Sequence, residues 1–321
     1  MRRLGEAALS FAAYGFPESH ALSFALLAYA STWLKVHRPA QFTASLLNHQ
    51  PMGFYGPATL VQDARRHGLR ILPVCAARSR WESTAEADDA VRLGLRHVRG
   101  LREDAARALE RERERAPFAS LADCLRRTPL NAAERRALAA TGAFHALGPH
   151  RRAALWQVEA AWSAEEPLLQ EADEEPDTPG ALRPMSPGER LAADFTGLGL
   201  TGGAHPLARL RDQLPDVWRA ADLPLGRDGE TVRIAGPVIC RQRPGTAKGF
   251  LFLSLEDETG IANAVVHPDL FVARRLLITQ EPALRITGRL EHRAGVIHIR
   301  AERIEPLTLP DLPFQTAHSF H

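Results

Sequence analysis

The chain has 321 residues, of which 45% are hydrophobic and 24% charged, a composition that fits a folded protein of two or three domains. The formal net charge is only +2, which excludes attraction by overall charge, so any binding of polyanions must rest on local basic patches. The apolar run at residues 21–34 is too short to span a bilayer, which argues against a membrane protein. The three cysteines, Cys75, Cys124 and Cys240, lack the spacing typical of zinc sites or disulfides. A protein of the reducing cytoplasm is therefore expected.

Residues 1–155 are predicted to be almost wholly helical. A helix at residues 19–37 is apolar around most of its circumference, so it is expected to be deeply packed. A proline ends this helix, and two further helices follow at residues 40–48 and 58–67. Residues 71–74 are predicted to be extended.

The stretch Val98-Arg-Gly-Leu101 precedes a charged helix at residues 103–115 and has the hydrophobic-x-Gly-hydrophobic shape of a helix-hairpin-helix turn. In such a turn the glycine lets the backbone approach DNA, and the amides that open the next helix hold a phosphate. The alternative is an ordinary helix pair with a glycine cap. The candidate DNA-binding residues of this turn are Arg99, Gly100 and Leu101.

The middle of the chain continues with helices and then changes composition. A helix is predicted at residues 121–127, and a second one is capped by Asn131. Residues 159–185 are acidic and proline-rich, which indicates a solvated linker that cannot build a core. Residues 186–228 are predicted to form a helical lead-in to the next domain, and the tail at 307–321 is expected to lie over the surface.

Residues 229–306 have the element order of an OB-fold, the small β-barrel that binds single-stranded nucleic acid. A helix is predicted at residues 269–277, between the third and fourth strands. The strands are predicted at residues 231–240, 250–255, 261–266, 283–291 and 296–305. The expected fold class is therefore multidomain α+β, with an all-α region followed by a C-terminal OB-fold β-barrel.

The loop after the first of these strands carries basic residues, and the next strand alternates leucine with phenylalanine. Period-two alternation places the leucines on one face of the sheet and Phe250 and Phe252 on the other. Arg241, Arg243 and Lys248 are predicted to ring the loop, so that a basic rim and an aromatic platform bind a single strand. The alternative is that the phenylalanines belong to the core.

Several stretches of the chain together carry a family resemblance: Tyr14-Gly-Phe-Pro-Glu-Ser-His-Ala21, Tyr29-Ala-Ser-Thr-Trp-Leu-Lys35, Pro39-Ala-Gln-Phe42 and the run from Gln50 to Gly68. They resemble the bacterial C-family DNA polymerases, the alpha subunits of the replicative polymerase (DnaE). The sequence Phe16-Pro-Glu-Ser-His20 resembles the error-prone, ImuC-like branch of that family, as does the stretch from Arg241 to Gly260. The similarity covers nearly the whole chain and is weakest at residues 158–185 and after residue 306.

The resemblance implies the C-terminal, DNA-holding portion of a translesion DNA polymerase. It implies the end of the fingers at residues 1–70, a helix-hairpin-helix domain at 71–158 and the OB domain at 229–306. Ser19 and His20 match the part of the fingers near the phosphates of the incoming nucleotide.

The Mg²⁺ expected for the parent polymerase is held by palm aspartates, and these are absent here. No catalytic residue and no metal ligand is therefore assigned, and the chain alone is expected to be inactive. The acidic run Glu256-Asp-Glu258 is placed at a hairpin turn rather than in a metal site.

The implied partners are duplex and single-stranded DNA, an ImuB-like Y-family protein and, through it, the sliding clamp. Only Leu168-Leu-Gln170 faintly resembles the clamp-binding peptide of replicative relatives. An alternative function is a protein-docking OB module that links the polymerase to such accessory partners. An RNA-binding OB domain, as in aminoacyl-tRNA synthetases, is disfavoured by residues 1–68, which that class lacks.

Overall fold

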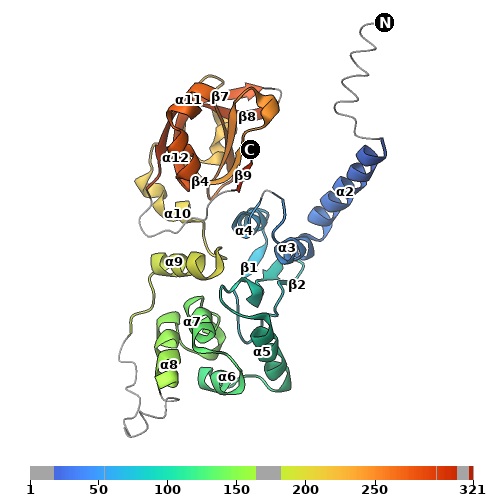
Figure 1. Ribbon diagram of the computed structural model, residues 1–321, viewed down its shortest axis with the longest axis vertical. Coiled ribbons are helices and arrows are strands. Elements are labelled where there is room, and N and C mark those ends of the chain that lie inside the picture. Colours follow the sequence, from blue (N-terminus) through green and yellow to red (C-terminus); the bar gives the residue numbers. More distant parts are fainter. Residues whose placement is uncertain (1–17, 54, 164–181, 294, 309–317, 321) are drawn as a thin grey trace.

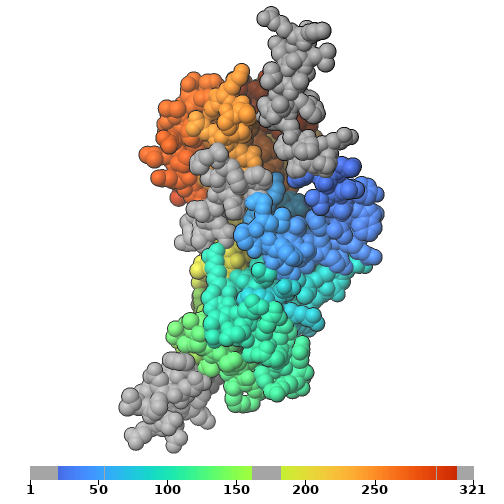
Figure 2. Space-filling view, turned by 45° about the vertical axis from the view of Figure 1, so that its right-hand side comes forward, coloured from blue at the N-terminus to red at the C-terminus, as the bar shows by residue number. Residues whose placement is uncertain are grey.

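Figure 1 shows the computed structural model of the chain, which describes residues 18–53, 55–163, 182–293, 295–308 and 318–320. A β-barrel lies at one end of the molecule and the helical units lie at the other, and Figure 2 shows the barrel in orange above the helical units in blue and green. The predicted fold class, multidomain α+β with a C-terminal barrel, is confirmed. Most of the acidic linker and of the tail falls outside the described residues.

The first described helix, α2 (Glu18–His37), is far more exposed than its sequence predicts. Its large apolar side chains are between 41% and 74% exposed, and Figure 1 shows the helix projecting from the rest of the molecule. The prediction of deep packing is therefore wrong for this chain, because no described element covers the helix along its length. None of the described helices is long and apolar enough to cross a membrane. The exposed side chains are Leu22, Phe24, Leu26, Leu27, Tyr29, Trp33, Leu34 and Val36.

Two short helices follow, α3 (Pro39–Asn48) and α4 (Pro57–Arg66), each with a proline in its first turn. After them comes a small sheet that the sequence pattern does not predict, apart from its first strand. Its strands are β1 (Arg70–Leu72), β2 (Thr84–Ala87) and β3 (Ala90–Arg92), in the order β1-β3-β2. The expectation of an almost wholly helical N-terminal half is corrected here. Strands of three or four residues are too short for a readable alternation, and pairing with distant residues stabilises them.

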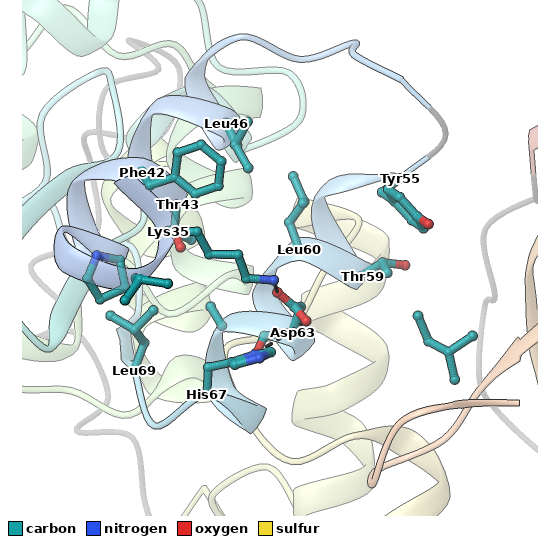
Figure 3. Close-up of a pocket in the computed structure, with 14 residues that line it drawn as sticks. Lys35, Phe42, Thr43, Leu46, Tyr55, Thr59, Leu60, Asp63, His67 and Leu69 are labelled. Atoms are coloured by element: carbon teal, nitrogen blue, oxygen red, sulfur yellow. Dashed lines mark hydrogen bonds and ion pairs between the residues drawn. The ribbon is translucent and has the colours of Figure 1, made fainter. Parts of the chain in front are cut away.

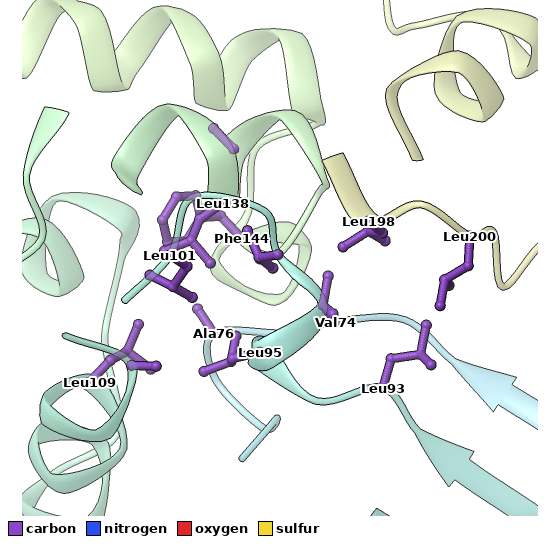
Figure 4. Packing of buried hydrophobic residues seen from close by; sticks show 14 of the residues in the cluster. Val74, Ala76, Leu93, Leu95, Leu101, Leu109, Leu138, Phe144, Leu198 and Leu200 are labelled. Carbon is purple, nitrogen blue, oxygen red and sulfur yellow. The ribbon is translucent and has the colours of Figure 1, made fainter. Parts of the chain in front are cut away.

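The next helices follow the hairpin turn and form one hydrophobic core with the small sheet. They are α5 (Glu103–Arg115), α6 (Leu121–Arg127), α7 (Ala132–Ala140) and α8 (Arg151–Ser163), with short 3₁₀ turns η1 (Leu95–His97) and η2 (His145–Leu147). Asn131 caps α7 in a capping box with Glu134, as predicted for its N-terminus. In Figure 4, Leu101, Leu138 and Phe144 point into this core from different segments. The core also includes Leu198 and Leu200, so the lead-in packs on the helical part.

The lead-in runs through α9 (Pro187–Leu198), α10 (Pro206–Leu210) and the 3₁₀ turns η4 (Arg211–Gln213) and η5 (Ala220–Leu225). Ser186 caps α9 in a capping box with Glu189, and Gly199 ends the helix in the left-handed conformation, with φ of 72°. Figure 1 shows α9 and α10 between the barrel and the other helices, so this segment connects the two lobes.

The barrel contains the five strands and the helical insertion that the sequence predicts. The strands are β4 (Thr231–Gln242), β5 (Leu251–Glu256), β6 (Ile261–Val266), β7 (Ala283–Arg293) and β8 (Val296–Pro306), with the 3₁₀ turn η6 (Gly245–Ala247) after β4. The sheet order β5-β6-β8-β7-β4, together with a pairing of β5 with β4, closes the barrel. The predicted single helix is divided at Arg274 into α11 (Pro268–Ala273) and α12 (Arg275–Gln280). A short strand of the tail, β9 (His318–Phe320), pairs in parallel with β4.

Candidate nucleic-acid interface

The alternation of β5 places leucines inside the barrel and an aromatic ring outside. Leu251, Leu253 and Leu255 are at most 4% exposed, whereas Phe252 is 40% exposed. Burying each leucine stabilises the fold by about 1.5–3 kcal/mol, so the inward direction of these side chains is strongly favoured. The predicted leucine face of the strand is therefore confirmed, with Phe252 on the opposite face, whereas Phe250 precedes β5.

A row of outward side chains crosses the barrel from Phe252. Phe252 lies opposite Val265 on β6, Val265 lies opposite Arg300 on β8, and Arg300 lies opposite Arg289 on β7. Residues directly opposite each other on paired strands project from the same face. The row therefore joins one exposed ring and two arginines on one outer surface, which we call the outer row (Phe252, Val265, Arg300 and Arg289).

Arg300 and Arg289 are not among the candidates predicted from the sequence. The alternation of β8 could have indicated that Arg300 faces outward. His298, Arg300 and Glu302 alternate there with residues that the structure buries, such as Ile299. The charge beside the outer row is mixed, because both of its arginines lie near carboxylates. Nε of Arg289 donates to Glu302 at 3.2 Å, and Arg300 lies near Glu291. Glu291 lies 3.1 Å from Nε2 of His298 and 3.5 Å from Nε of Arg300, and Arg293 is also within 3.4 Å of it.

Arg241 does not lie on the rim, which corrects the prediction for this residue. It is only 5% exposed; its Nε donates to the carbonyl of Ile278 at 2.8 Å and its Nη2 to the carbonyl of Glu281 at 2.5 Å. Burial lowers the pKa of this guanidinium. Strand β4 continues through Gln242, beyond the predicted end at residue 240, so Arg241 is part of the strand. Its side chain links β4 to the end of α12.

Arg243 and Lys248 remain on the loop and are exposed, as predicted. The guanidinium carbon of Arg243 lies 4.6 Å from the ring centre of Phe271, a cation–π contact that orients the side chain. Lys248 adopts φ of 50°, a left-handed conformation that ends the turn η6. Phe250 is half-buried, and its ring meets that of His267 edge-on at 5.2 Å, so this ring already has a partner.

The hairpin turn contains an exposed glycine in the left-handed conformation. Gly100 has φ of 83° and is exposed, and an added Cβ would meet nothing within 4 Å, so the turn faces open space. Leu101 packs into the core, whereas Arg99 is exposed and its Nη1 donates to the carbonyl of Thr196 at 3.1 Å. The first turn of α5 is acidic, with Glu103 and Asp104, and these carboxylates oppose the attraction of the helix N-terminus for phosphate.

The acidic run at the end of β5 is engaged by the protein itself. Glu256 accepts from both terminal nitrogens of Arg66 at 3.0 Å, and Asp257 accepts from backbone amides, including that of Ala220 at 2.8 Å. Glu258 pairs with Arg211, whose Nε and Nη2 each lie 2.8 Å from it. Burial raises the pKa of Glu256 to about 7. These carboxylates do not fit a Mg²⁺ site, because protein donors occupy their oxygens.

Within the described residues, no group of three histidine, cysteine, aspartate or glutamate side chains is arranged to hold a metal ion. Ser19 and His20 lie in the first turn of α2, but their side chains fall outside what the structure describes. The peptide Leu168-Leu-Gln170 also lies outside the described residues.

A cavity of about 550 Å³ lies between the N-terminal helices and the barrel. Figure 3 shows Phe42, Leu46 and Leu60 on its walls, with Lys35 paired to Asp63 at 3.1 Å across it. Its lining is mainly apolar, so it offers a place for an apolar group rather than for acid–base chemistry.

Two family models match the chain in the regions just described. A helix-hairpin-helix motif matches residues 68–154, and an OB-fold nucleic acid binding domain matches residues 232–307. The hairpin turn and the outer row lie inside these two matches.

Two similar proteins carry the same name. An error-prone DNA polymerase of Bordetella parapertussis is 50% identical over 305 residues, and one of Alkalilimnicola ehrlichii is 48% identical over 301 residues. These alignments cover 93% and 92% of this chain but only 29% of each relative, so the chain spans less than a third of their length. Among solved structures, asparaginyl-tRNA synthetase from Pyrococcus horikoshii is 26% identical over 24% of this chain and 20% of that one, with a TM-score of 0.21. So low a score carries no inference. Over more than nine-tenths of its own length, the chain is therefore similar to one part of the error-prone DNA polymerases.

Proposed function

We propose that this chain is the DNA-holding, C-terminal portion of an error-prone DNA polymerase and that its barrel binds single-stranded template DNA. The observation that carries the proposal is the outer row, in which an exposed phenylalanine is aligned with two arginines across four strands. A flat ring offers a surface on which any base can stack, and arginines beside it attract the phosphates of the same strand.

The rim adds charge at one edge of this surface. Arg243 and Lys248 are exposed on the loop that precedes β5, the strand of Phe252. A strand that stacks a base on Phe252 would pass these two cations, and each phosphate contact would release bound counterions. Phe250 contributes less, because His267 already covers part of its ring.

The hairpin turn is proposed to contact duplex DNA. Arg99 and Gly100 are both exposed, and the glycine leaves room for a sugar-phosphate backbone to approach. Leu101 supports the turn from within the core rather than touching DNA. The acidic first turn of α5 makes this contact weaker than a basic helix start would.

Polymerisation is proposed only for the whole protein, since the chain spans 29% of its relatives. Mg²⁺ would be held there by carboxylates outside this chain, and Ser19 and His20 would lie near the nucleotide phosphates. Translesion synthesis, a cytoplasmic location and contacts with an ImuB-like Y-family protein and the sliding clamp belong to the same proposal. The purified chain is expected to add no nucleotide to a primed template with magnesium; extension that disappears when one of its residues is replaced would refute this.

A second candidate function is the protein-docking module. It is favoured by Val272 and Leu276 on the barrel helices, which are 73% and 71% exposed. Large apolar side chains exposed in this way are typical of contacts with other proteins.

Phe252→Ala separates these functions. Stacking predicts a loss of about 1–3 kcal/mol in the binding of a labelled oligo-dT, measured by fluorescence anisotropy. The thermal melt should change little, because the ring is only partly buried. Leu276→Ala, which removes another exposed apolar side chain, is the matched control and should bind as the parent chain does. Equal affinities for both variants would reject the stacking surface and favour the docking module.

A further inference from the structure

A second cavity lies away from the outer row and the hairpin turn, where the lead-in packs on the helical part. Its volume is about 370 Å³. Its walls come from α8, α9, α10 and the loop before α10, and from Ile71, Pro73, Leu93 and Thr141 of the helical part. Three arginines line it, Arg151, Arg190 and Arg209, against a single carboxylate, Asp194. We call this cavity the arginine pocket.

Both oxygens of the carboxylate in the pocket, that of Asp194, contact other side chains of the protein. Oδ2 of Asp194 accepts a hydrogen bond from Thr201 at 2.7 Å, and Oδ1 lies 2.7 Å from Nη1 of Arg151. The second contact lacks the alignment of a hydrogen bond, but at this distance it is a close charge pair. Both side chains are largely buried, 13% and 19% exposed. Asp194 therefore neutralises the charge of Arg151. The described lining of the pocket holds no second carboxylate to neutralise Arg190 and Arg209.

Arg151 itself is held in place. Its side chain crosses directly over Gly142, where a Cβ would lie 2.4 Å from its Nε, and its Nη1 donates to the carbonyl of Arg190 at 3.2 Å. The guanidinium of Arg151 is therefore fixed in one position, where it lines the pocket.

Arg190 and Arg209 form no ion pair and no side-chain hydrogen bond with any residue that the structure describes. Both are exposed side chains at the edge of the pocket. Two unpaired guanidiniums that border one concave space produce a local positive potential, and they offer the planar donor geometry that matches a phosphate.

The pocket lies along the segment that connects the two proposed DNA contacts. At one end, the amide of Arg99 in the hairpin turn donates to the carbonyl of Gly197 at 2.8 Å. At the other end, Arg211 of the lead-in pairs with Glu258 of the barrel. Figure 1 shows α9 in this intermediate position between barrel and helices.

We propose that the arginine pocket binds a phosphate group, through Arg190 and Arg209, and that this phosphate belongs to the DNA backbone between the hairpin turn and the barrel. The choice of DNA as the source rests on the proposed function, whereas the phosphate chemistry does not. A free phosphate-bearing molecule is the other possible source.

The test compares two double variants of the full chain. Arg190→Gln with Arg209→Gln removes the two unpaired charges of the pocket. Arg111→Gln with Arg227→Gln is the control, because it removes the same charge from exposed arginines that do not line the pocket and have no described ion pair. Thermal melts verify that both variants remain folded.

The first readout is the ³¹P NMR line width of inorganic phosphate added to each protein. The pocket variant should lose the broadening that the parent chain and the control produce. If it broadens the line as the control does, the pocket does not bind phosphate and the inference is overturned.

The second readout is the salt dependence of DNA binding, with a primed template as the probe. The pocket variant should bind more weakly, and its log–log salt slope should fall by about 0.7–0.9 for each phosphate that the protein no longer neutralises. Loss of phosphate binding with unchanged DNA binding would overturn the DNA source in favour of a free phosphate compound. Failure of the outer row would instead appear as normal binding by Phe252→Ala, so the two proposals fail separately.

Discussion

Arg66 on α4 and Glu256 at the end of β5 are 190 positions apart and form a buried pair, with both terminal guanidinium nitrogens 3.0 Å from one carboxylate oxygen. Thr59 donates to the other oxygen at 3.4 Å. The glutamate side chain is 4% exposed and the arginine 17%. This pair attaches the barrel to the helical part, and its carboxylate is held at a site where burial opposes its charge.

The pair predicts a pH dependence of stability that Glu256→Gln should remove. Burial, the largest influence, raises the pKa of Glu256 from its ordinary 4.5 to about 7, so between these values the folded chain binds more protons than the unfolded one. Stability contributed by this group is therefore lost as pH rises from 4.5 to above 7, by roughly 3 kcal/mol in all. His205 acts in the opposite sense, because burial lowers its pKa to about 4.

The measurement is therefore the difference between Glu256→Gln and the parent chain, in which the contribution of His205 cancels. Urea unfolding at several pH values should show the variant gaining relative stability as pH rises from 5 to 8. A difference that stays constant over this range would contradict the raised pKa.

Arg241→Ala should destabilise the barrel without changing its charge contacts with DNA. The substitution leaves the carbonyls of Ile278 and Glu281 without their donors, at a cost of about 1–3 kcal/mol for each buried group. Arg243→Ala is the matched control, since this side chain is exposed. It should leave the stability of the barrel unchanged and lower the salt slope of oligo-dT binding. Thermal melts and salt titrations of oligo-dT binding distinguish the two. A reduced salt slope in an Arg241→Ala variant of unchanged stability would show that Arg241 contacts DNA after all.

The exposed apolar surface of α2 predicts self-association of the isolated chain. Leu22, Leu26 and Tyr29 recur at helical spacing and are 63%, 65% and 74% exposed. Changing all three to glutamine should convert a concentration-dependent mixture into a monomer in sedimentation velocity experiments, because apolar area is removed from water on association.

Three glutamines at Leu225, Leu276 and Val296, which are also exposed but lie on separate elements, serve as the control for this experiment and should leave association unchanged. A parent chain that is monomeric at every concentration would show that the exposed apolar surface of α2 does not cause self-association.

The sequence predicted the elements whose pattern is local. The leucines of β5 recur with the period of a strand, and Asn131 caps α7. The position of Arg241 could not be read in the same way, because the extra two residues of β4 depend on pairing with β5 and β9.

Features that form only through contacts between distant residues were not predicted, because no local pattern in the sequence indicates them. Strand β3 pairs with β1 on one side and with β2 on the other, so these short strands are stabilised by partners rather than by their own residues. The arginine pocket brings together residues from three helices, so no stretch of sequence displays it. The burial expected for α2 was wrong because that inference assumed a covering surface that the described chain does not supply.

The outer face of the barrel is proposed to bind single-stranded DNA through a basic rim and the outer row, and one triple variant tests this binding directly. It replaces Arg243, Lys248 and Arg300 together by glutamine, and oligo-dT binding is measured by fluorescence anisotropy at several salt concentrations. We expect weaker binding and a log–log salt slope lower by about 2, since each single-strand phosphate contact contributes about 0.7. A slope equal to that of the parent chain, in a variant that melts normally, would show that these cations do not hold the strand.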